Sequence, residues 1–229
     1  MVEFGRGGRW DQADRAEVSL LARADSRTKI LTAARSVFAR KGYRSSTVTD
    51  VIEEASVARA TFYKHFPNKR EVFFVLLREF LDTLYENTRN YVLKETESPR
   101  ELSARIRDGL VVFYRYFFEN RTIVQVYYRE AFGTDARLYA AWDDFDRRMT
   151  TLFKKVLEVG VEQGTLRPID TGLVATALMM VFLQVPYREI MVGGAASVDI
   201  EMLAEEVVAL VMNGILRQPA RGGEQSQAT

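Results

Sequence analysis

Residues 47–69 read TVTDVIEEASVARATFYKHFPNK, and this stretch carries the strongest structural signal in the chain. Thr47 and Asp50 stand three residues apart, so the hydroxyl can accept from the Asp50 amide while the carboxylate accepts from the Thr47 amide. This pairing predicts a helix that begins at the next residue. Residues 55–57 interrupt the helical period, and a second helix is predicted over residues 59–65. Two short helices joined by such a turn are typical of a helix-turn-helix that docks on DNA.

The second helix has a buried face and an exposed face. Phe62 and Phe66 lie four residues apart and are expected to pack inward. Pro67 cannot continue the helix, whereas Asn68 can cap a new helix whose N-terminus, together with Lys69, attracts phosphate. The side chains that remain on this segment and beside it are the predicted DNA contacts: Arg44, Thr47, Thr49, Arg59, Ala60, Thr61, Tyr63, Lys64, His65 and Lys69.

Arg59 and Lys64 are predicted to reach base edges, with Thr61 assisting. Arginine can read guanine with two hydrogen bonds, at about 1–3 kcal/mol per good pair. The other predicted contacts would position the DNA backbone. His65 is the chain's one histidine, which excludes a histidine-dependent catalytic site and a multi-histidine metal site. Its place in the motif favours a phosphate contact.

Residues 61–69 resemble the motif Thr-(Phe/Leu)-Tyr-X-His-Phe-X-X-Lys of the TetR/AcrR family of bacterial transcriptional regulators. The preceding helix is similar too, because it ends in Lys-Gly-Tyr at residues 41–43. The resemblance is specific over about residues 26–80. It departs at Ser56, where the family usually has a turn glycine, and at Ala58, where it usually has a capping serine. Each departure costs about 1 kcal/mol, so we expect local weakening without loss of the domain. The apolar stripe of the preceding helix consists of Ile30, Leu31, Ala34, Val37 and Phe38.

Composition agrees with a cytoplasmic regulator and excludes several other classes. The chain has 229 residues, of which 47% are hydrophobic, and no cysteine, so neither a disulfide framework nor a thiol nucleophile is expected. We see no secretion signal and no apolar run near the roughly 18 residues that span a bilayer. Residues 26–69 hold nine Lys and Arg against three Asp and Glu, a net +6 in a chain of net +1. A basic module on a mildly acidic body suits duplex DNA, although such charge clusters are often only solvated faces.

The whole pattern predicts an all-α protein of about nine helices, with a three-helix DNA-binding domain and a helical ligand-binding and dimerisation domain. We expect a flexible N-terminal arm over residues 1–25, the DNA-binding domain over 26–70, the effector domain over 71–217 and a disordered tail over 218–229. The arm could contact a minor groove or be an unordered leader, and residues 15–23 could form a short helix. Gly133 and Gly164 are expected to stop helices. The later helices are expected at about residues 69–94, 98–119, 122–132, 135–163, 170–191 and 198–216.

Aromatic residues concentrate between Phe113 and Phe145, where eleven of them occur in 33 positions. The resemblance implies that these helices and the helix after Asn68 surround an inducer pocket. Aromatic stripes at helical spacing are also common in ordinary cores, so both interpretations stay open. Polar residues amid apolar neighbours point to a ligand more sharply: Gln125, Arg129, Glu130, Gln184 and Arg188. The predicted ligand contacts are Phe80, Leu84, Phe113, Phe117, Gln125, Tyr128, Arg129, Trp142, Phe145, Met179 and Phe182.

The last two predicted helices, 170–191 and 198–216, each have a broad apolar face. Two such faces would form a four-helix bundle with a second copy, and in the TetR/AcrR family the C-terminal helix pair does so. The alternative is that both helices are internal. The predicted homodimer places two recognition helices in major grooves on the order of 34 Å apart. A hydrophobic inducer is expected to change their separation through the long helix after Asn68. We expect a repressor, although the sequence does not give the sign of regulation.

Two other function classes remain open from the sequence. One is a DNA-binding regulator of the same fold without an inducer, whose interior the aromatic residues fill. The other is a helical small-molecule carrier or enzyme. No catalytic triad, metal-ligand spacing or phosphate-binding glycine loop is visible, so we expect neither enzymatic activity nor a cofactor or metal.

Overall fold

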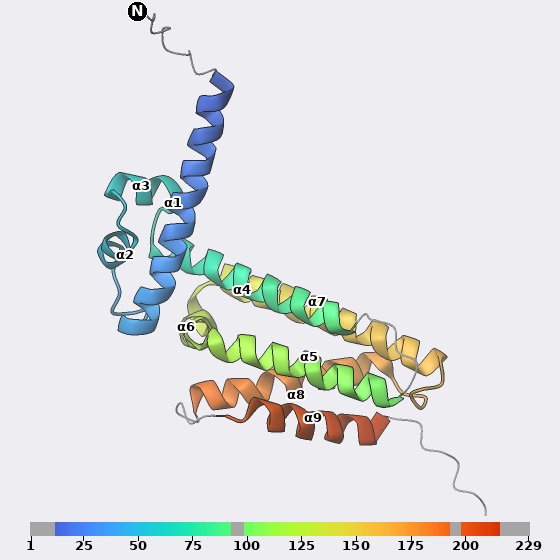
Figure 1. Ribbon diagram of the computed structural model, residues 1–229. Helices are drawn as coiled ribbons and strands as arrows, with labels where there is room; N and C mark the ends of the chain where they lie inside the picture. Colours follow the sequence, from blue (N-terminus) through green and yellow to red (C-terminus); the bar gives the residue numbers. More distant parts are fainter. Residues whose placement is uncertain (1–11, 93–98, 193–197, 216–229) are drawn as a thin grey trace, which may run out of the picture. The chain divides into compact units, whose positions relative to one another are not determined.

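The computed structural model describes residues 12–92, 99–192 and 198–215 (Figure 1). Every regular element in these ranges is an α-helix, which confirms the predicted all-α class with nine helices over the described residues. The chain divides into two compact units, Met1–Leu76 and Leu77–Thr229, called unit 1 and unit 2 below. The tail from residue 218, the loop at residues 193–197 and residues 1–11 of the predicted arm lie outside the described residues.

Unit 1 consists of α1 (Gln12–Lys41), α2 (Val48–Ala55), α3 (Arg59–His65) and the first turns of α4 (Lys69–Val92). α2 and α3 both pack against α1 and against each other (Figure 1). The core of the unit draws on all four helices, because the apolar side chains of each recur at helical spacing on one face. Its most deeply buried residues are Ile30, Ala34, Val37, Phe38, Val51, Phe62, Val72 and Phe73.

The helix-turn-helix forms as the sequence predicts. Thr47 Oγ1 accepts a hydrogen bond from the Asp50 amide at 3.1 Å, and Asp50 Oδ2 accepts from the Thr47 amide at 2.8 Å. Ser56 occupies the left-handed region with φ 52°, as expected at the position of the missing glycine. Ala58 provides no side-chain cap for α3. Asn68 Oδ1 accepts from the Glu71 amide at 3.0 Å and caps α4.

α1 is longer than predicted, because it begins at Gln12 and runs without interruption to Lys41. Residues 12–25 are therefore helical, where we expected a flexible arm with at most a short helix over residues 15–23. This stretch has no glycine or proline and contains four alanines, two leucines and two arginines, which favour helix. At its end Asp25 and Lys29 form an i, i+4 ion pair with 2.6 Å between Oδ2 and Nζ.

Unit 2 consists of the rest of α4 with α5 (Pro99–Glu119), α6 (Arg121–Thr134), α7 (Ala136–Glu162), α8 (Thr171–Met191) and α9 (Ile200–Ile215). α7 packs on α8, α5 packs on α9, and the short α6 contacts α7 and α8. Figure 1 shows α5 and α9 running alongside each other, and α5 contacts α8 as well. The buried faces of these helices meet in an interior that is rich in aromatic rings.

Aspartates fix the starts of three of these helices. Asp135, Asp170 and Asp199 each accept a hydrogen bond from an amide in the first turn of α7, α8 and α9, as N-cap residues do. The prediction that Gly133 stops a helix is wrong, because α6 continues to Thr134 and the Asp135 cap marks the boundary instead. Gly164 does follow the end of α7, with φ 72°.

α8 is the one helix among the described residues that is long and apolar enough to cross a membrane. A core helix meets the same criterion of length and composition. α8 packs on α7 and buries Ala175, Met179, Phe182 and Ile190, and Pro186 interrupts its hydrogen-bond ladder. Only 28% of its apolar window is buried, so packing inside the unit accounts for part of its apolar surface and the rest is exposed.

Candidate nucleic-acid interface and effector interior

α3 presents the face that a DNA-reading helix needs. Phe62 and Phe66 are 0% and 3% exposed and anchor the helix inward, as predicted. Arg59, Ala60 and Lys64 are exposed, and Tyr63 is 45% exposed. The Arg59 guanidinium lies over the Tyr63 ring, with 5.6 Å from Cζ to the ring centroid. Neither Arg59 nor Lys64 forms an ion pair with any residue that the structure describes. The two predicted base-reading side chains are thus accessible to a ligand of negative charge.

The acidic residues of α2 are neutralised by basic residues at the end of α1. Arg40 Nη2 and Ser36 Oγ each donate to the Glu54 carboxylate at 2.8 Å. Lys41 Nζ donates to Asp50 Oδ1. This bond, with those from Thr47, lowers the pKa of Asp50 from 3.8 to about 2. Two of the nine basic residues that gave this region its net charge therefore serve to hold α2 on α1.

Lys69 has a structural role that the sequence did not reveal. Its Nζ donates to the backbone carbonyls of Tyr43 and Ser46, at 2.5 Å and 2.6 Å. It also lies 4.3 Å from the centroid of the Tyr43 ring, which packs in turn against Phe38 and Phe73. Lys69 thereby ties the start of α4 to the loop that leads into α2. Its predicted phosphate contact stays a prediction.

The other predicted DNA contacts lie at the surface or partly exposed. Arg44, Thr47 and Thr49 are exposed on the α1–α2 loop and the first turn of α2, while Thr61 and His65 are half-buried on α3. Arg27 was not among the predicted contacts, although it stands next to α3, with its Cζ 5.8 Å from the centroid of the Phe66 ring. Its position in the middle of α1 gave no motif signal.

Four of the interior rings of unit 2 form a cluster between α4 and α5, composed of Phe80, Phe113, Tyr116 and Phe117. Phe80 stacks on Tyr116 with 5.6 Å between ring centroids, and Phe117 lies 5.7 Å from Phe80 and 5.8 Å from Phe113. Three of these rings were predicted ligand contacts, and the structure brings them together. Leu84, Phe145, Met179 and Phe182 were predicted contacts too, and all four are buried.

A second cluster joins α6, α7 and α8 through Tyr127, Tyr128, Trp142, Phe145 and Tyr187. Tyr127 stacks on Trp142 with 4.4 Å between centroids, and Tyr128 lies 4.4 Å from Tyr187. Burial raises the pKa of both Tyr127 and Tyr128, so their hydroxyls stay protonated at neutral pH. The predicted contacts Tyr128, Trp142 and Phe145 belong to this cluster, whereas Tyr127 and Tyr187 were missed because ring spacing along one helix does not show which helix faces which.

The polar residues that we took as pointers to a ligand are not buried charges. Arg129, Gln184 and Arg188 are exposed, because they fall on the outward faces of α6 and α8. The Gln125 side chain is half-buried, and its Nε2 donates to the Ile190 carbonyl at 3.2 Å. The side chain of Glu130 lies outside the described residues. Because Arg129 and Arg188 are exposed, they do not place a positive charge in the interior that could bind an anionic ligand.

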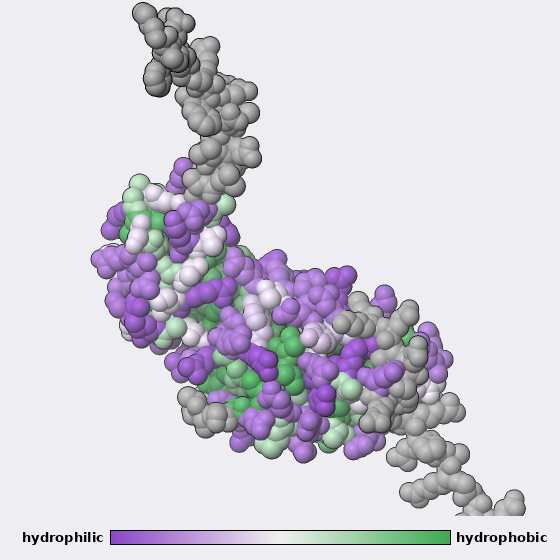
Figure 2. Space-filling view, viewed as in Figure 1, coloured by the Kyte–Doolittle hydropathy of each residue, from purple (hydrophilic) through white to green (hydrophobic). Residues whose placement is uncertain are grey.

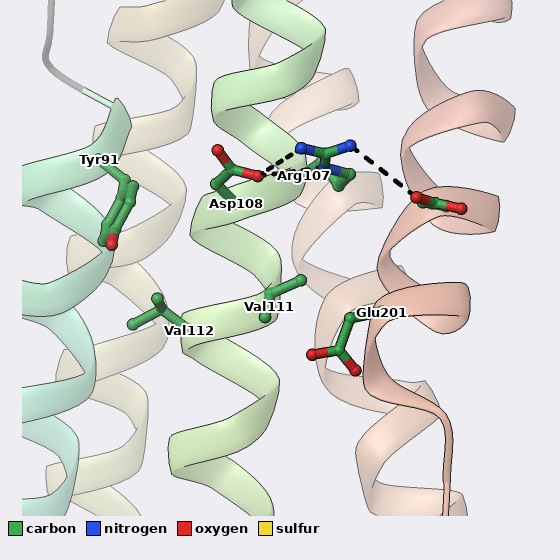
Figure 3. Close-up of a pocket in the computed structure, with 7 residues that line it drawn as sticks. Tyr91, Arg107, Asp108, Val111, Val112 and Glu201 are labelled. Carbon is green, nitrogen blue, oxygen red and sulfur yellow. Dashed lines mark hydrogen bonds and ion pairs between the residues drawn. The ribbon is translucent and has the colours of Figure 1, made fainter.

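One cavity of about 480 Å³ opens at the surface of unit 2 between α4, α5 and α9 (Figure 3). Figure 3 shows Arg107 bonded to Asp108 on α5 and paired with a glutamate of α9, with Tyr91 on the opposite side. None of the predicted ligand contacts lines it; the lining residues are Tyr91, Arg107, Asp108, Val111, Val112, Glu201 and Glu205. Over the described residues, no group of three or more acidic or histidine side chains could hold a metal ion.

Comparison with known proteins agrees with this geometry in both units. Residues 30–76 match the family described as bacterial regulatory proteins, tetR family. Residues 99–215 match the tetracyclin repressor-like C-terminal domain, which covers more than half of the chain. The chain belongs to the TetR family. TetR-family regulators are soluble DNA-binding proteins that typically function as dimers, and this protein is a DNA-binding transcriptional regulator, not an enzyme.

Relatives of the chain include both a transcriptional repressor and a transcriptional activator of the HTH type. The HTH-type transcriptional repressor KstR2 of Rhodococcus jostii is 28% identical over 191 residues, or 82% of this chain and 90% of that protein. The HTH-type transcriptional activator FasR of Mycolicibacterium smegmatis is 26% identical over 166 residues, or 69% and 71%. The structure of the ketosteroid transcriptional regulator KstR2 of Mycobacterium tuberculosis superposes with a TM-score of 0.59 at 23% identity, over 84% of this chain and 95% of that one. This structural likeness shows the fold.

Proposed function

We propose that this protein is a homodimeric TetR-family repressor that leaves its operator when a hydrophobic small molecule binds inside unit 2. The observation that carries the DNA-binding half is the exposed pair Arg59 and Lys64 on α3, which no acidic side chain among the described residues neutralises. A repressor is favoured by the similarity to KstR2 of Rhodococcus jostii. Because the operator is chromosomal, the protein would act in the cytoplasm.

The dimer would form through α8 and α9, as predicted from their apolar faces. Part of each apolar face packs inside unit 2, since Phe182, Val207 and Val208 are buried. The outward side remains apolar even so, and Figure 2 shows hydrophobic residues at the surface in the region of these two helices. Single exposed apolar residues are ordinary, but a stripe of them on both α8 and α9 supports an interface between copies. The stripe consists of Leu173, Met180, Met202 and Leu210, which are 69%, 67%, 59% and 71% exposed.

The effector would contact the two aromatic clusters of unit 2. Their stacked rings suit a flat or polycyclic apolar compound, and the relative from Mycobacterium tuberculosis is described as a ketosteroid regulator. A hydrophobic compound with an anionic group, such as an acyl thioester or fatty acid, would need Arg129 or Arg188 to face the interior. The exposure of both arginines weakens this alternative.

The ligand signal would travel along α4, which carries Phe80 of the first aromatic cluster. Arg148 on α7 binds the same helix, because its Nη1 lies 2.8 Å from Asp82 Oδ1 and its Cζ lies 4.0 Å from the Tyr85 ring centroid. A ligand that separates α7 from α4 would therefore change the tilt of α4 and the spacing of the two recognition helices.

The first test is DNA selection from a random duplex library, followed by fluorescence-polarisation binding at two salt concentrations. Wild type should enrich a two-fold symmetric site. Arg59→Ala with Lys64→Ala should lose that enrichment, because the base-edge contacts are gone. Its residual binding should stay salt-dependent, because the predicted backbone contacts are still present.

The matched control is Lys154→Ala with Lys155→Ala, which removes the same charge from the exposed side of α7. This variant should keep site selection and differ only in weak nonspecific binding. Equal loss of selection in both double variants would mean that net charge alone governs binding, and the assignment of α3 as the reading helix would be rejected. Release of the selected DNA by an apolar compound would support the inducer half of the proposal.

A further inference from the structure

Tyr114 occupies the inner face of α5, one of the two helices that hold the first aromatic cluster. The buried residues of α5 in this region are Leu110, Phe113, Tyr114 and Phe117, which recur at helical spacing. Tyr114 is 0% exposed, and its ring meets the Phe113 ring edge-on with 5.6 Å between centroids. It therefore belongs to the interior of unit 2, next to the rings that we assign to the effector.

The Tyr114 hydroxyl is buried without a hydrogen-bond partner among the residues that the structure describes. Folded proteins rarely leave a buried hydroxyl unpaired, since its lost hydration is not replaced. Arg105 Nε is also buried without a partner of its own, but the Arg105 side chain has further N–H groups and interacts elsewhere, with the charge of Glu101 nearby. The Tyr114 hydroxyl has a single proton to donate and no comparable substitute.

Packing alone does not explain a tyrosine at this position. The positions around it on α5 are Phe113, Phe117 and Phe118, so phenylalanine is compatible with this part of the helix. Gln125 differs from Tyr114, because its amide is already satisfied by the Ile190 carbonyl. The hydroxyl of Tyr114 adds a polar group to an apolar interior where the described protein groups make no use of it.

The surroundings determine what kind of group the hydroxyl can bind. Burial raises the pKa of Tyr114, and no charged residue contributes to that shift. The phenol is therefore a protonated hydrogen-bond donor at neutral pH, and no cation is among the causes of its pKa shift, which favours a neutral partner over an anionic one. A neutral oxygen acceptor carried by an apolar body meets these conditions.

We propose that Tyr114 is the polar contact of the effector site and donates a hydrogen bond to the carbonyl oxygen of a neutral, flat, apolar ligand. The proposal rests on the function proposed above, because it requires that unit 2 bind an effector. It names the part of the ligand that the aromatic clusters cannot select: rings recognise shape and apolar area, whereas one fixed donor selects the position of an oxygen.

The test uses the full-length protein and two fluorescent probes of equal shape. One is a dimethylaminonaphthyl ethyl ketone, whose emission reports hydrogen bonding to its carbonyl. The other is the matched propyl-substituted dimethylaminonaphthalene, in which a methylene replaces the carbonyl. Wild type should bind the ketone. Tyr114→Phe should bind it about three- to tenfold more weakly and shift its emission to shorter wavelength, while its affinity for the propyl probe should not fall.

Tyr116→Phe is the matched control, since Tyr116 lies on the same helix with its ring stacked on Phe80 but is only half-buried. It should bind both probes as wild type does. Tyr114→Phe should also unfold at the same or a higher temperature, because it removes an unpaired buried hydroxyl. A lower unfolding temperature would show that the hydroxyl is satisfied within the protein, against the proposal.

The outcomes separate this inference from the proposed function. If neither probe binds wild type, both the effector function and the role of Tyr114 are rejected. If wild type and Tyr114→Phe bind the ketone equally tightly, unit 2 takes up an apolar ligand but Tyr114 does not select it, and only the present inference is overturned.

Discussion

Asp50 holds the start of α2 through three groups at once. Its carboxylate accepts from Lys41 Nζ and from both the amide and the hydroxyl of Thr47. The bond from Lys41 is the largest cause that lowers the pKa of Asp50 to about 2, and the Thr47 amide comes next. The ionised form is therefore favoured by the folded domain. This stabilisation is present above the unfolded pKa near 4 and is lost as the pH falls through the folded pKa.

We predict that Asp50→Asn is less stable than wild type at pH 7 and that the difference shrinks as the pH is lowered from about 4 towards 2. The reason is that protonation removes from wild type the same charge that the asparagine lacks throughout. Urea unfolding of the two proteins at a series of pH values, followed by circular dichroism, measures the difference. Glu53→Gln, at an exposed position of the same helix, is the control and should show little loss at pH 7. A constant gap between Asp50→Asn and wild type down to pH 2 would contradict the assignment.

At the residue scale, the sequence predicted local bonds and missed distant ones. The capping box of Thr47 and Asp50 and the left-handed Ser56 follow from neighbours within a few positions. Lys69 bonds to carbonyls 26 and 23 residues earlier, and no pattern along the chain indicates that pairing. Exposure of Arg59 and Lys64 on α3 follows from helical spacing within a few residues, so the sequence predicted it. The bonds that tie Lys69 to the α1–α2 loop are distant in sequence, so the sequence did not predict them.

At the scale of helices, ends were predictable where a side chain marks them. Asp170 begins α8 as expected, and α3 has the predicted bounds. The start of α1 was missed, because residues 12–25 lack the clear apolar stripe that marks the rest of the helix. The absence of a helix breaker in this stretch was the available signal. Exposure of Arg129 and Arg188 was also missed. A shift of one position on a helix turns a side chain by about 100°, so an apolar sequence neighbourhood does not imply an apolar spatial one.

The end of α7 depends on a close contact at Gly160. A Cβ at this position would lie 2.7 Å from Leu166 Cδ1 and 2.8 Å from Cγ. Leu166 is buried, and its amide donates to the Gly160 carbonyl at 2.9 Å, so the side chain cannot move away freely. Gly160 therefore lets the chain fold back after α7 and seal the interior of unit 2.

We predict that Gly160→Ala destabilises unit 2 by about 1 kcal/mol net. Overpacking costs about 1–3 kcal/mol, and the better helix propensity of alanine returns up to about 1. Thermal unfolding measures the loss. Gly172→Ala is the matched control, because its Cβ would meet only Asp170 Oδ1 at an ordinary 3.5 Å; it should be neutral or slightly stabilising. Equal midpoints for the two variants would show that Leu166 repacks without cost.

At the scale of the whole molecule, the proposed function requires two copies. A single α3 contacts one half-site, whereas specific affinity comes from two half-sites read together. The basic charge of residues 26–69 and the apolar stripe of α8 and α9 lie in different units, so binding of DNA and association of copies can be altered independently. This separation makes the dimer testable without touching the DNA contacts.

We predict that Met180→Glu with Leu210→Glu turns the dimer into a monomer of 26.2 kDa, because two like charges per copy would be buried against their mates. Sedimentation velocity measures the mass, and binding to the selected operator should weaken at least tenfold through loss of the second half-site. Tyr139→Glu places the same charge on another exposed apolar residue, on α7 at 63% exposure, and should leave the dimer intact. A double variant that remains dimeric would show that the interface does not lie on α8 and α9. The exposed leucines and methionines of these helices would then need another explanation.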